Sequence, residues 1–169
     1  EKARSLLSDA GYPNGEGWPG LEIVYNTQEA HRKIAVAVQQ MWKSNLNIDV
    51  TISNQEWKVY LNTVSQGQFQ LARRGWIGDY VDPNNFLDLF LSTGGNNNTG
   101  YANSEFDDII LRHAPRAEDR DKRYELFYEA ETMLMEEMPF IPFYTYTHKH
   151  LIHPSVEGIY PNLMDSLNL

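Results

Sequence analysis

The sequence contains no cysteine, and positive charge is sparse in it. Without cysteine the chain can have no disulfide, no thiolate metal ligand and no cysteine nucleophile. Its 14 Lys and Arg residues stand against 23 Asp and Glu residues, and the net charge of −9 repels phosphate backbones and anionic lipid. We therefore expect that the protein binds neither nucleic acid nor a membrane surface.

Long apolar runs are absent as well. No stretch approaches the roughly 18 to 20 apolar residues that span a bilayer, so no direct membrane span is expected in this sequence. The opening EKARSLLSDAGYPNG has no initiator methionine and is typical of a helix already under way, which ends at Gly11 and Pro13. This pattern predicts a piece of a longer protein whose targeting signals lie upstream.

Motifs of catalysis are missing too. The sequence has no G-x-S-x-G elbow, no H-E-x-x-H pair and no phosphate-cradling glycine loop. The acidic pairs Asp107 with Asp108 and Glu136 with Glu137 are adjacent on predicted helices, so their side chains point in different directions. We expect no enzyme. A peptidase is kept as the alternative from another class, and a structural interaction domain as a third possibility.

Strands and helices alternate through the first half of the chain. The segment LEIVYN alternates apolar and polar residues as a strand does, and the apolar residues that follow recur at helical spacing, with Thr27 available as an N-cap. In order, the sequence predicts a strand at 21–26, a helix at 27–46, a strand at 48–52, a helix at 56–66 and a strand at 69–74.

This alternation predicts right-handed crossovers and a largely parallel sheet. Such sheets bind their ligands outside the carboxyl ends of the strands. The rule selects the three segments that follow the predicted strands, at residues 26–31, 54–57 and 73–82.

Helices dominate the second half of the predicted chain. The last and longest of them is amphipathic, so we expect it to pack on the sheet, and Pro139 ends it. The tail FYTYTHKHLIH alternates in the manner of a strand. The sequence predicts helices at 83–91, 104–113 and 118–138, a polar loop between the first two, and one or two strands at 140–153.

Three tail histidines offer a metal-binding interpretation. His148 and His150 would share one face of a strand, with His153 close behind, and imidazole is a common metal ligand. No carboxylate or fourth ligand accompanies them at fixed spacing, and alternating polar residues usually form the solvated face of a strand. We expect no metal site.

The segment LARRGWIGDYVDP leads from a predicted strand into a loop. Its charged and aromatic side chains indicate a binding loop. On the pattern alone, Trp76 and Tyr80 could equally cap the edge of the core, with Asp79 acting as a helix cap.

Five segments carry a resemblance to a known family: NTQEAHRKIA, NQEWKVYL, LARRGWIGDYVDP, NNNTGYANSEFDDII and MLMEEMPFIPFY. In order and spacing they resemble the peptide-binding members of the family 5 (cluster C) extracellular solute-binding proteins. The resemblance implies an α/β fold, a class II periplasmic-binding-protein-like lobe with a largely parallel mixed sheet flanked by helices. Residues 1–153 would form part of the C-terminal lobe of a two-lobed receptor, and 154–169 would head back toward the N-terminal lobe.

The resemblance also assigns roles to residues. Asp79 would pair with the α-ammonium group of a peptide ligand. Arg73 would receive the carboxylate of a short peptide and His31 that of a longer one, and two tryptophans would line side-chain pockets. The predicted ligand-binding residues are His31, Trp57, Arg73, Trp76, Asp79 and Tyr80.

One position departs from the family pattern. An arginine that helps to fix the carboxylate of dipeptides is replaced by Val64, which puts dipeptide binding in doubt. Arg74 is an extra cation that we interpret as a surface residue outside the site.

The implied function is an extracytoplasmic receptor domain that captures oligopeptides for import by an ABC transporter. It needs no cofactor. Its partners would be an oligopeptide, the missing N-terminal lobe and, through the full-length protein, the transporter permease. The receptor would be periplasmic or a cell-surface lipoprotein. A member of the same superfamily that binds nickel or another small solute is the alternative.

Overall fold

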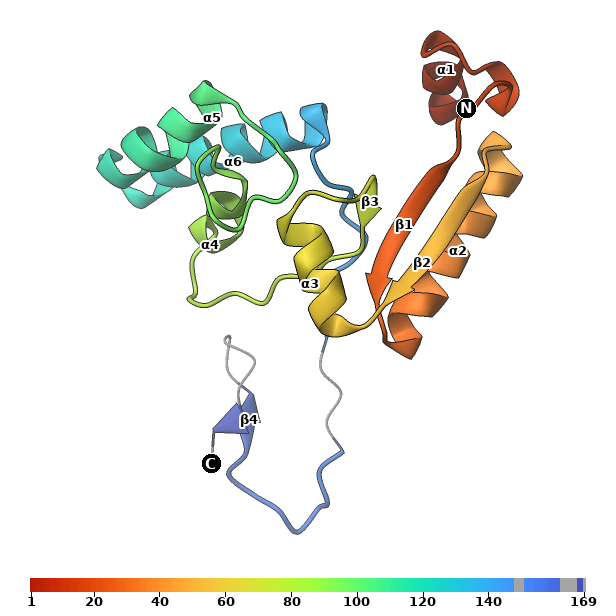
Figure 1. Ribbon diagram of the computed structural model, residues 1–169. Helices are drawn as coiled ribbons and strands as arrows, with labels where there is room; N and C mark the ends of the chain where they lie inside the picture. Colours follow the sequence, from red (N-terminus) through yellow and green to blue (C-terminus); the bar gives the residue numbers. More distant parts are fainter. Residues whose placement is uncertain (148–150, 162–166, 169) are drawn as a thin grey trace. The chain divides into compact units, whose positions relative to one another are not determined.

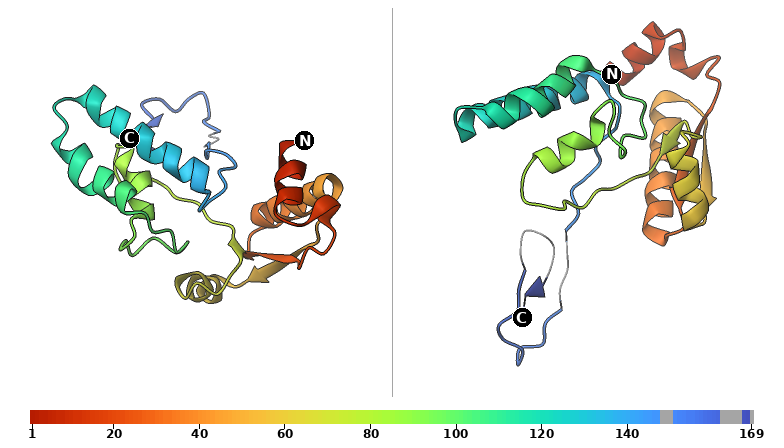
Figure 2. Two further views of the ribbon diagram at one scale, coloured as in Figure 1. Left: turned by 90° about the horizontal axis from the view of Figure 1, so that it is seen from above. Right: turned by 60° about the vertical axis from the view of Figure 1, so that its left-hand side comes forward.

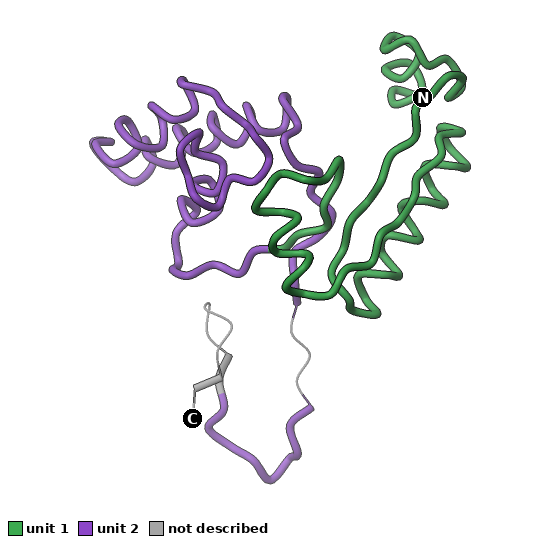
Figure 3. Tube along the Cα trace, in the orientation of Figure 1, with its two compact units in different colours: residues 1–75 green, residues 76–169 purple. Residues whose placement is uncertain are grey.

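The computed structural model describes residues 1–147, 151–161 and 167–168. The chain divides into two compact units, Glu1–Gly75 and Trp76–Leu169 (Figure 3). Within the described residues, no helix is both long and apolar enough to cross a membrane.

The first unit is built on a parallel three-stranded sheet, as the alternation of elements predicts (Figure 1). β1 is its central strand, with β2 on one side and β3 on the other. The elements are α1 (Lys2–Asp9), η1 (Pro13–Gly15), β1 (Leu21–Asn26), α2 (Glu29–Leu46), β2 (Val50–Gln55), α3 (Trp57–Ser65) and β3 (Leu71–Ala72).

Alternating residues of β1 give the sheet two buried faces, and each face is covered by a helix. Ile23 and Tyr25 pack in one cluster with Val38 of α2, whereas Val24 packs in another with Val64 of α3. Helices α2 and α3 therefore cover opposite faces, as the views in Figures 1 and 2 also show. Each fully buried aliphatic side chain contributes about 1.5–3 kcal/mol.

The predicted N-cap of α2 is wrong. The helix begins at Glu29 after Gln28, and no side chain caps it. The Thr27 hydroxyl instead lies 2.7 Å from Asn54 Oδ1, and the Thr27 amide donates to the Gln55 carbonyl oxygen at 2.9 Å. Thr27 thus continues the β1–β2 pairing, because its polar groups find partners on the neighbouring strand first.

The second unit is mainly helical. Phe106, Ala130 and Leu134 are almost fully buried in its core. Its elements are α4 (Asn84–Leu87), η2 (Asp88–Phe90), α5 (Ser104–Asp108), the π-helical turn η3 (Ile109–His113), η4 (Ala114–Arg116), α6 (Arg120–Glu137), and an antiparallel pair, β4 (Tyr160–Pro161) and β5 (Leu167–Asn168).

Helix α6 does not use its buried face as predicted. Phe127, Ala130 and Leu134 pack in one cluster with residues of α4, α5, η3 and η4, so the helix belongs to a helical core and not to a helix layer on the sheet. Figures 1 and 2 show α6 running beside α5 and η3. Amphipathicity predicts which face of a helix is buried but not what buries it.

The tail also differs from its predicted strands. Residues 140–147 and 151–153 form no strand, and side chains such as Phe143, Tyr144 and Leu151 are exposed. Alternation predicts a strand only when a neighbouring strand can accept its hydrogen bonds. His148 and His150 lie outside the described residues, and the His153 ring is 2.8 Å from the Ser155 hydroxyl.

Candidate functional site

The carboxyl ends of the three parallel strands lie at one edge of the sheet in the first unit. Asn26 at the end of β1 is opposite Gln55 at the end of β2, and Val24 is opposite Ala72 at the end of β3. Three predicted site residues follow these strand ends directly. They are His31 in the first turn of α2, Trp57 at the start of α3 and Arg73 after β3.

His31 is a buried histidine in contact with the end of β1. Its side chain is 8% exposed, and Nδ1 lies 2.9 Å from Asn26 Oδ1. Burial lowers the pKa of His31 below its usual 6.5, the charge of Arg73 lowers it further, and a hydrogen bond with the backbone of Asn26 opposes both effects. The ring is consequently neutral at neutral pH, and it must take up a proton before it can carry the charge that pairs with a carboxylate.

Arg73 is fixed through its backbone. Its amide donates to the Val24 carbonyl oxygen at 2.8 Å, and the Tyr60 hydroxyl donates to the Arg73 carbonyl oxygen. Burial raises the pKa of Tyr60, so its hydroxyl keeps the proton of that bond. Trp57 stacks on Tyr60 with ring centroids 5.8 Å apart but stays 53% exposed, which leaves much of the indole available to a ligand.

In the second unit, the loop that begins at Trp76 is held by one buried side chain. Asn85 is 3% exposed, and its Oδ1 accepts from Trp76 Nε1 at 2.8 Å and from the Asp79 amide at 3.1 Å. The Asp79 residue itself is exposed. This arrangement presents a carboxylate to solvent from a backbone that is anchored in the protein.

A second carboxylate, Asp88, belongs to the same unit and is bonded to Tyr80. The Tyr80 hydroxyl donates to Asp88 Oδ2 at 3.3 Å and accepts from Asn84 Nδ2 at 3.1 Å. Burial raises the pKa of Asp88, the bond from Tyr80 lowers it, and the charge of Asp79 raises it. Asp88 thus lies close enough to Asp79 to feel its charge, and two negative charges in one region favour a bound cation.

A charged pair fastens the far end of the same loop to α6. Arg123 forms a bidentate pair with Asp82, at 2.6 Å and 2.9 Å, and both side chains are less than one-third exposed. The guanidinium also lies 4.5 Å from the centre of the Phe127 ring. The hydrogen bonds from Arg123 hold the pKa of Asp82 below its usual 3.8.

Arg123→Ala is expected to lower the free energy of unfolding by about 1 to 2 kcal/mol, between the losses typical of exposed and of buried pairs. Because the pKa of Asp82 is depressed in the folded chain, the pair stabilises fully above the unfolded pKa, and this stabilisation is lost as the pH falls through the folded value. Urea unfolding at pH 7 and pH 3 measures both effects.

The matched control is Arg112→Ala, because Arg112 forms an exposed pair with Asp108 on one helical face. That change should cost about 0.5 kcal/mol or less. Equal losses for the two variants would show that the Asp82 pair does not anchor the loop.

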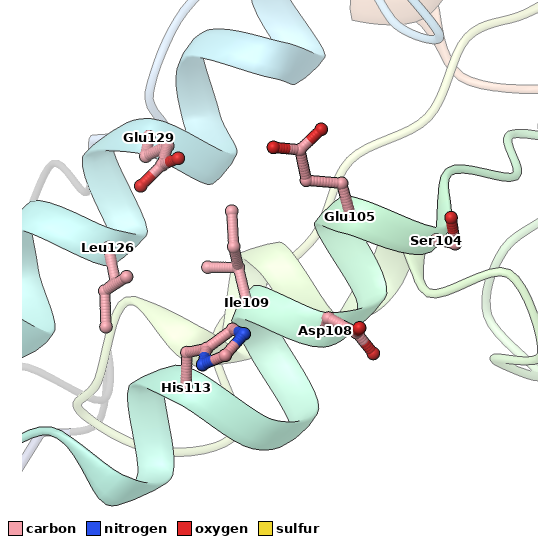
Figure 4. A pocket seen from close by; sticks show the side chains of 7 residues that line it. All are labelled: Ser104, Glu105, Asp108, Ile109, His113, Leu126 and Glu129. Atoms are coloured by element: carbon pink, nitrogen blue, oxygen red, sulfur yellow. The ribbon is translucent and has the colours of Figure 1, made fainter.

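A cavity of about 500 Å³ opens elsewhere in the second unit (Figure 4). Leu126 and Glu129 enter it from α6, and none of the predicted ligand-binding residues lines it. Among the described residues, no group of three or more His, Asp or Glu side chains is placed to hold a metal ion. The remaining lining residues are Ser104, Glu105, Asp108, Ile109 and His113.

Sequence reasoning missed the residues that support the site. Asn26, Asn85 and Arg123 hold His31, the Trp76 loop and Asp82, respectively. The only sequence signal for Asn85 is its place in the short helix directly after Pro83. Chain spacing does not predict which residue each of these side chains will contact, and polar side chains are mostly solvated.

Comparison with known proteins decides the family. Residues 1–98 match the model of "Bacterial extracellular solute-binding proteins, family 5 Middle". The chain belongs to this family. The resemblance seen in the sequence is thereby confirmed, and so is the fold class.

Family 5 relatives match over most of this chain. The oligopeptide-binding protein OppA of Bacillus subtilis is 42% identical over 154 residues, which are 90% of this chain and 28% of that protein. The structure of the Escherichia coli murein tripeptide-binding protein MppA superposes with a TM-score of 0.85 at 39% identity, over 97% of this chain and 31% of that one. The structure of Haemophilus influenzae OppA in complex with RPPGFSPFR superposes with a TM-score of 0.80 at 37% identity, over 86% of this chain and 28% of that one. The chain thus spans less than a third of the length of these relatives.

Proposed function

We propose that this chain is part of an extracytoplasmic receptor that captures oligopeptides for import by an ABC transporter. Similarity to OppA and MppA supports the ligand class, because these relatives are named for binding oligopeptides and a murein tripeptide. The observation that carries the proposal is that Arg73 and His31 follow the carboxyl ends of the parallel strands, where sheets of this kind bind their ligands. In the second unit, Asp79 supplies an exposed carboxylate on an anchored backbone.

Two cationic residues and an acidic one suit a ligand with opposite charges at its two ends. Every peptide shares a backbone, an ammonium group and a carboxylate, so a receptor that accepts many sequences must hold these groups. Charge-assisted hydrogen bonds provide the hold, and they are strongest where water is excluded. Asp79 binds the ammonium group, Arg73 or His31 the carboxylate, and Trp57, Trp76 and Tyr80 shape the surroundings of the side chains.

The remaining assignments follow from the receptor role. Residues 1–153 belong to the C-terminal lobe, 154–169 lead toward the N-terminal lobe, and the full-length protein delivers the peptide to a membrane permease. It works in the periplasm or as a cell-surface lipoprotein. No cofactor takes part, and the receptor does not cleave its ligand.

Mass spectrometry of ligands that co-purify with the full-length receptor tests this function. We expect a mixture of short peptides with free ends, which stay intact on incubation. Bound nickel or another small solute without peptide would instead support a different member of the superfamily, and peptide turnover would support an enzyme.

Val64 is expected to bias the receptor toward peptides longer than two residues. Its side chain is 3% exposed and packs with Val24 and Tyr60, so this position offers no cation to a dipeptide carboxylate. In a calorimetric series of di-, tri- and tetra-alanine, the dipeptide should bind at least about tenfold more weakly, as the loss of one charged hydrogen bond predicts. Equal affinities across the series would show that another group receives the dipeptide carboxylate.

A further inference from the structure

We propose that Asn85 is the positioning residue of the ammonium site, which holds Asp79 and Trp76 in their binding geometry. This inference rests on the proposed peptide-binding function and deepens it. Asn85 does not present its own side chain to a ligand, since it is almost completely buried. It acts through the loop, in which it bonds the Trp76 indole and the Asp79 backbone amide.

The geometry shows how one oxygen fixes the loop. Oδ1 of Asn85 accepts from the Trp76 indole at 2.8 Å and from the Asp79 amide at 3.1 Å, so both donors converge on the same atom. The two bonds set the direction of the indole and the backbone from which the Asp79 carboxylate extends. A shift of that backbone would move the carboxylate directly, because only one side-chain carbon separates them.

The loop passes close to Asn85 between its two bonds. A Cβ atom added at Gly78 would be at ordinary van der Waals distance from α4, 3.5 Å from Asn85 Oδ1 and 3.4 Å from the Phe86 ring. The backbone amide of Asn85 in turn donates to the backbone carbonyl oxygen of Asp82 at 3.1 Å. The acceptor is therefore held by α4 and by the loop together.

Loss of the buried acceptor Asn85 Oδ1 would leave two hydrogen-bond donors of the loop without an acceptor. Without Oδ1, the Trp76 indole and the Asp79 amide would each lose the buried oxygen that accepts their hydrogen bond. The loop would then move to satisfy both donors from solvent, and Asp79 would no longer be held in place before the ligand arrives. Pre-organisation of this kind raises affinity by removing the cost of ordering at binding.

Asn85→Ala in the full-length receptor is the test, with a tetrapeptide that has a free amino end as the ligand. We expect the affinity to fall roughly tenfold, since two hydrogen bonds that orient the site are lost. In NMR spectra of the unliganded receptor, the Trp76 indole N–H should shift and exchange faster with water. The N-acetylated tetrapeptide should lose much less from the same change, because it makes no ammonium contact with Asp79.

Two further variants separate positioning from stability. Leu87→Ala removes a buried side chain from the same short helix but leaves both loop bonds in place, so it should lower the melting temperature without changing affinity. Asn85→Asp keeps an acceptor oxygen in either protonation state, and it should keep the Trp76 indole signal and most of the affinity even if Asn85→Ala folds poorly.

The outcomes also distinguish this inference from the proposed function. A wild-type receptor that binds no peptide would overturn the function. A wild-type receptor that binds peptide, combined with unchanged affinity in Asn85→Ala, would overturn the positioning role. Equal losses for the free and the N-acetylated tetrapeptide would overturn it as well, because a purely structural defect does not discriminate between the two ligands.

Discussion

Replacing Asp79 with Asn is expected to lower the affinity of the full-length receptor for peptides with a free amino end by a hundredfold or more. The change keeps the shape of the side chain and leaves the Asp79 amide bonded to Asn85, so it deletes only the charge. One charge of a desolvated pair that is left without its partner typically costs about 3 to 5 kcal/mol. Isothermal titration calorimetry with matched peptides measures the loss.

N-acetylation of the peptide should cause a loss of similar size, because it removes the cation of the same pair. Each change should be nearly harmless once the other has been made, since a true pair gives strongly non-additive effects in a double-mutant cycle. Additive losses would place the ammonium group elsewhere. Asp88→Asn is the control for the loss of a nearby negative charge without the loss of a ligand contact. Asp88 is close enough to Asp79 to feel its charge, but no contact with the ligand is assigned to it, so this change should lower the affinity much less.

The first unit could be predicted well because its rules are local. Alternation identified β1 at its observed bounds, and strand–helix order with the crossover rule predicted the parallel sheet. Thr27 and α6 show where such rules end. A threonine before a helix is a good cap until a neighbouring strand offers it better partners, and an amphipathic helix packs wherever an apolar surface is free to receive it.

The site residues likewise fall into those that the sequence predicts and those that it does not. The sequence placed His31, Trp57 and Arg73 after the three strand ends, and the structure confirms those places. It did not indicate Asn85, since a second asparagine after a proline has no pattern that marks it as buried. Nor could it indicate that His31 is neutral, because the pKa depends on burial and on a charge 42 positions further along the chain.

Substitution of the cationic residues should show which of them receives the carboxylate of the ligand. For a tripeptide we expect Arg73→Gln to lower the affinity of the full-length receptor by about a hundredfold, by the same argument of a charge left without its partner. A tetrapeptide or longer peptide should lose less, since its carboxylate reaches His31 instead. Arg74→Gln removes an equal charge from the neighbouring exposed position and is the matched control, with an expected effect on affinity below about threefold.

The pH dependence separates the two cations further. An arginine stays charged, so tripeptide affinity should be nearly constant between pH 5 and pH 7. His31 is neutral in the free receptor because burial and the charge of Arg73 lower its pKa, and a bound carboxylate raises that pKa again. Binding of the longer peptide therefore takes up a proton, and its affinity should rise as the pH falls through the pKa of the complex, by at most about tenfold per pH unit, and level off below the pKa of the free receptor. His31→Gln or amidation of the peptide carboxyl group should abolish this rise. If the rise survives both changes, another group takes up the proton and His31 does not receive the carboxylate.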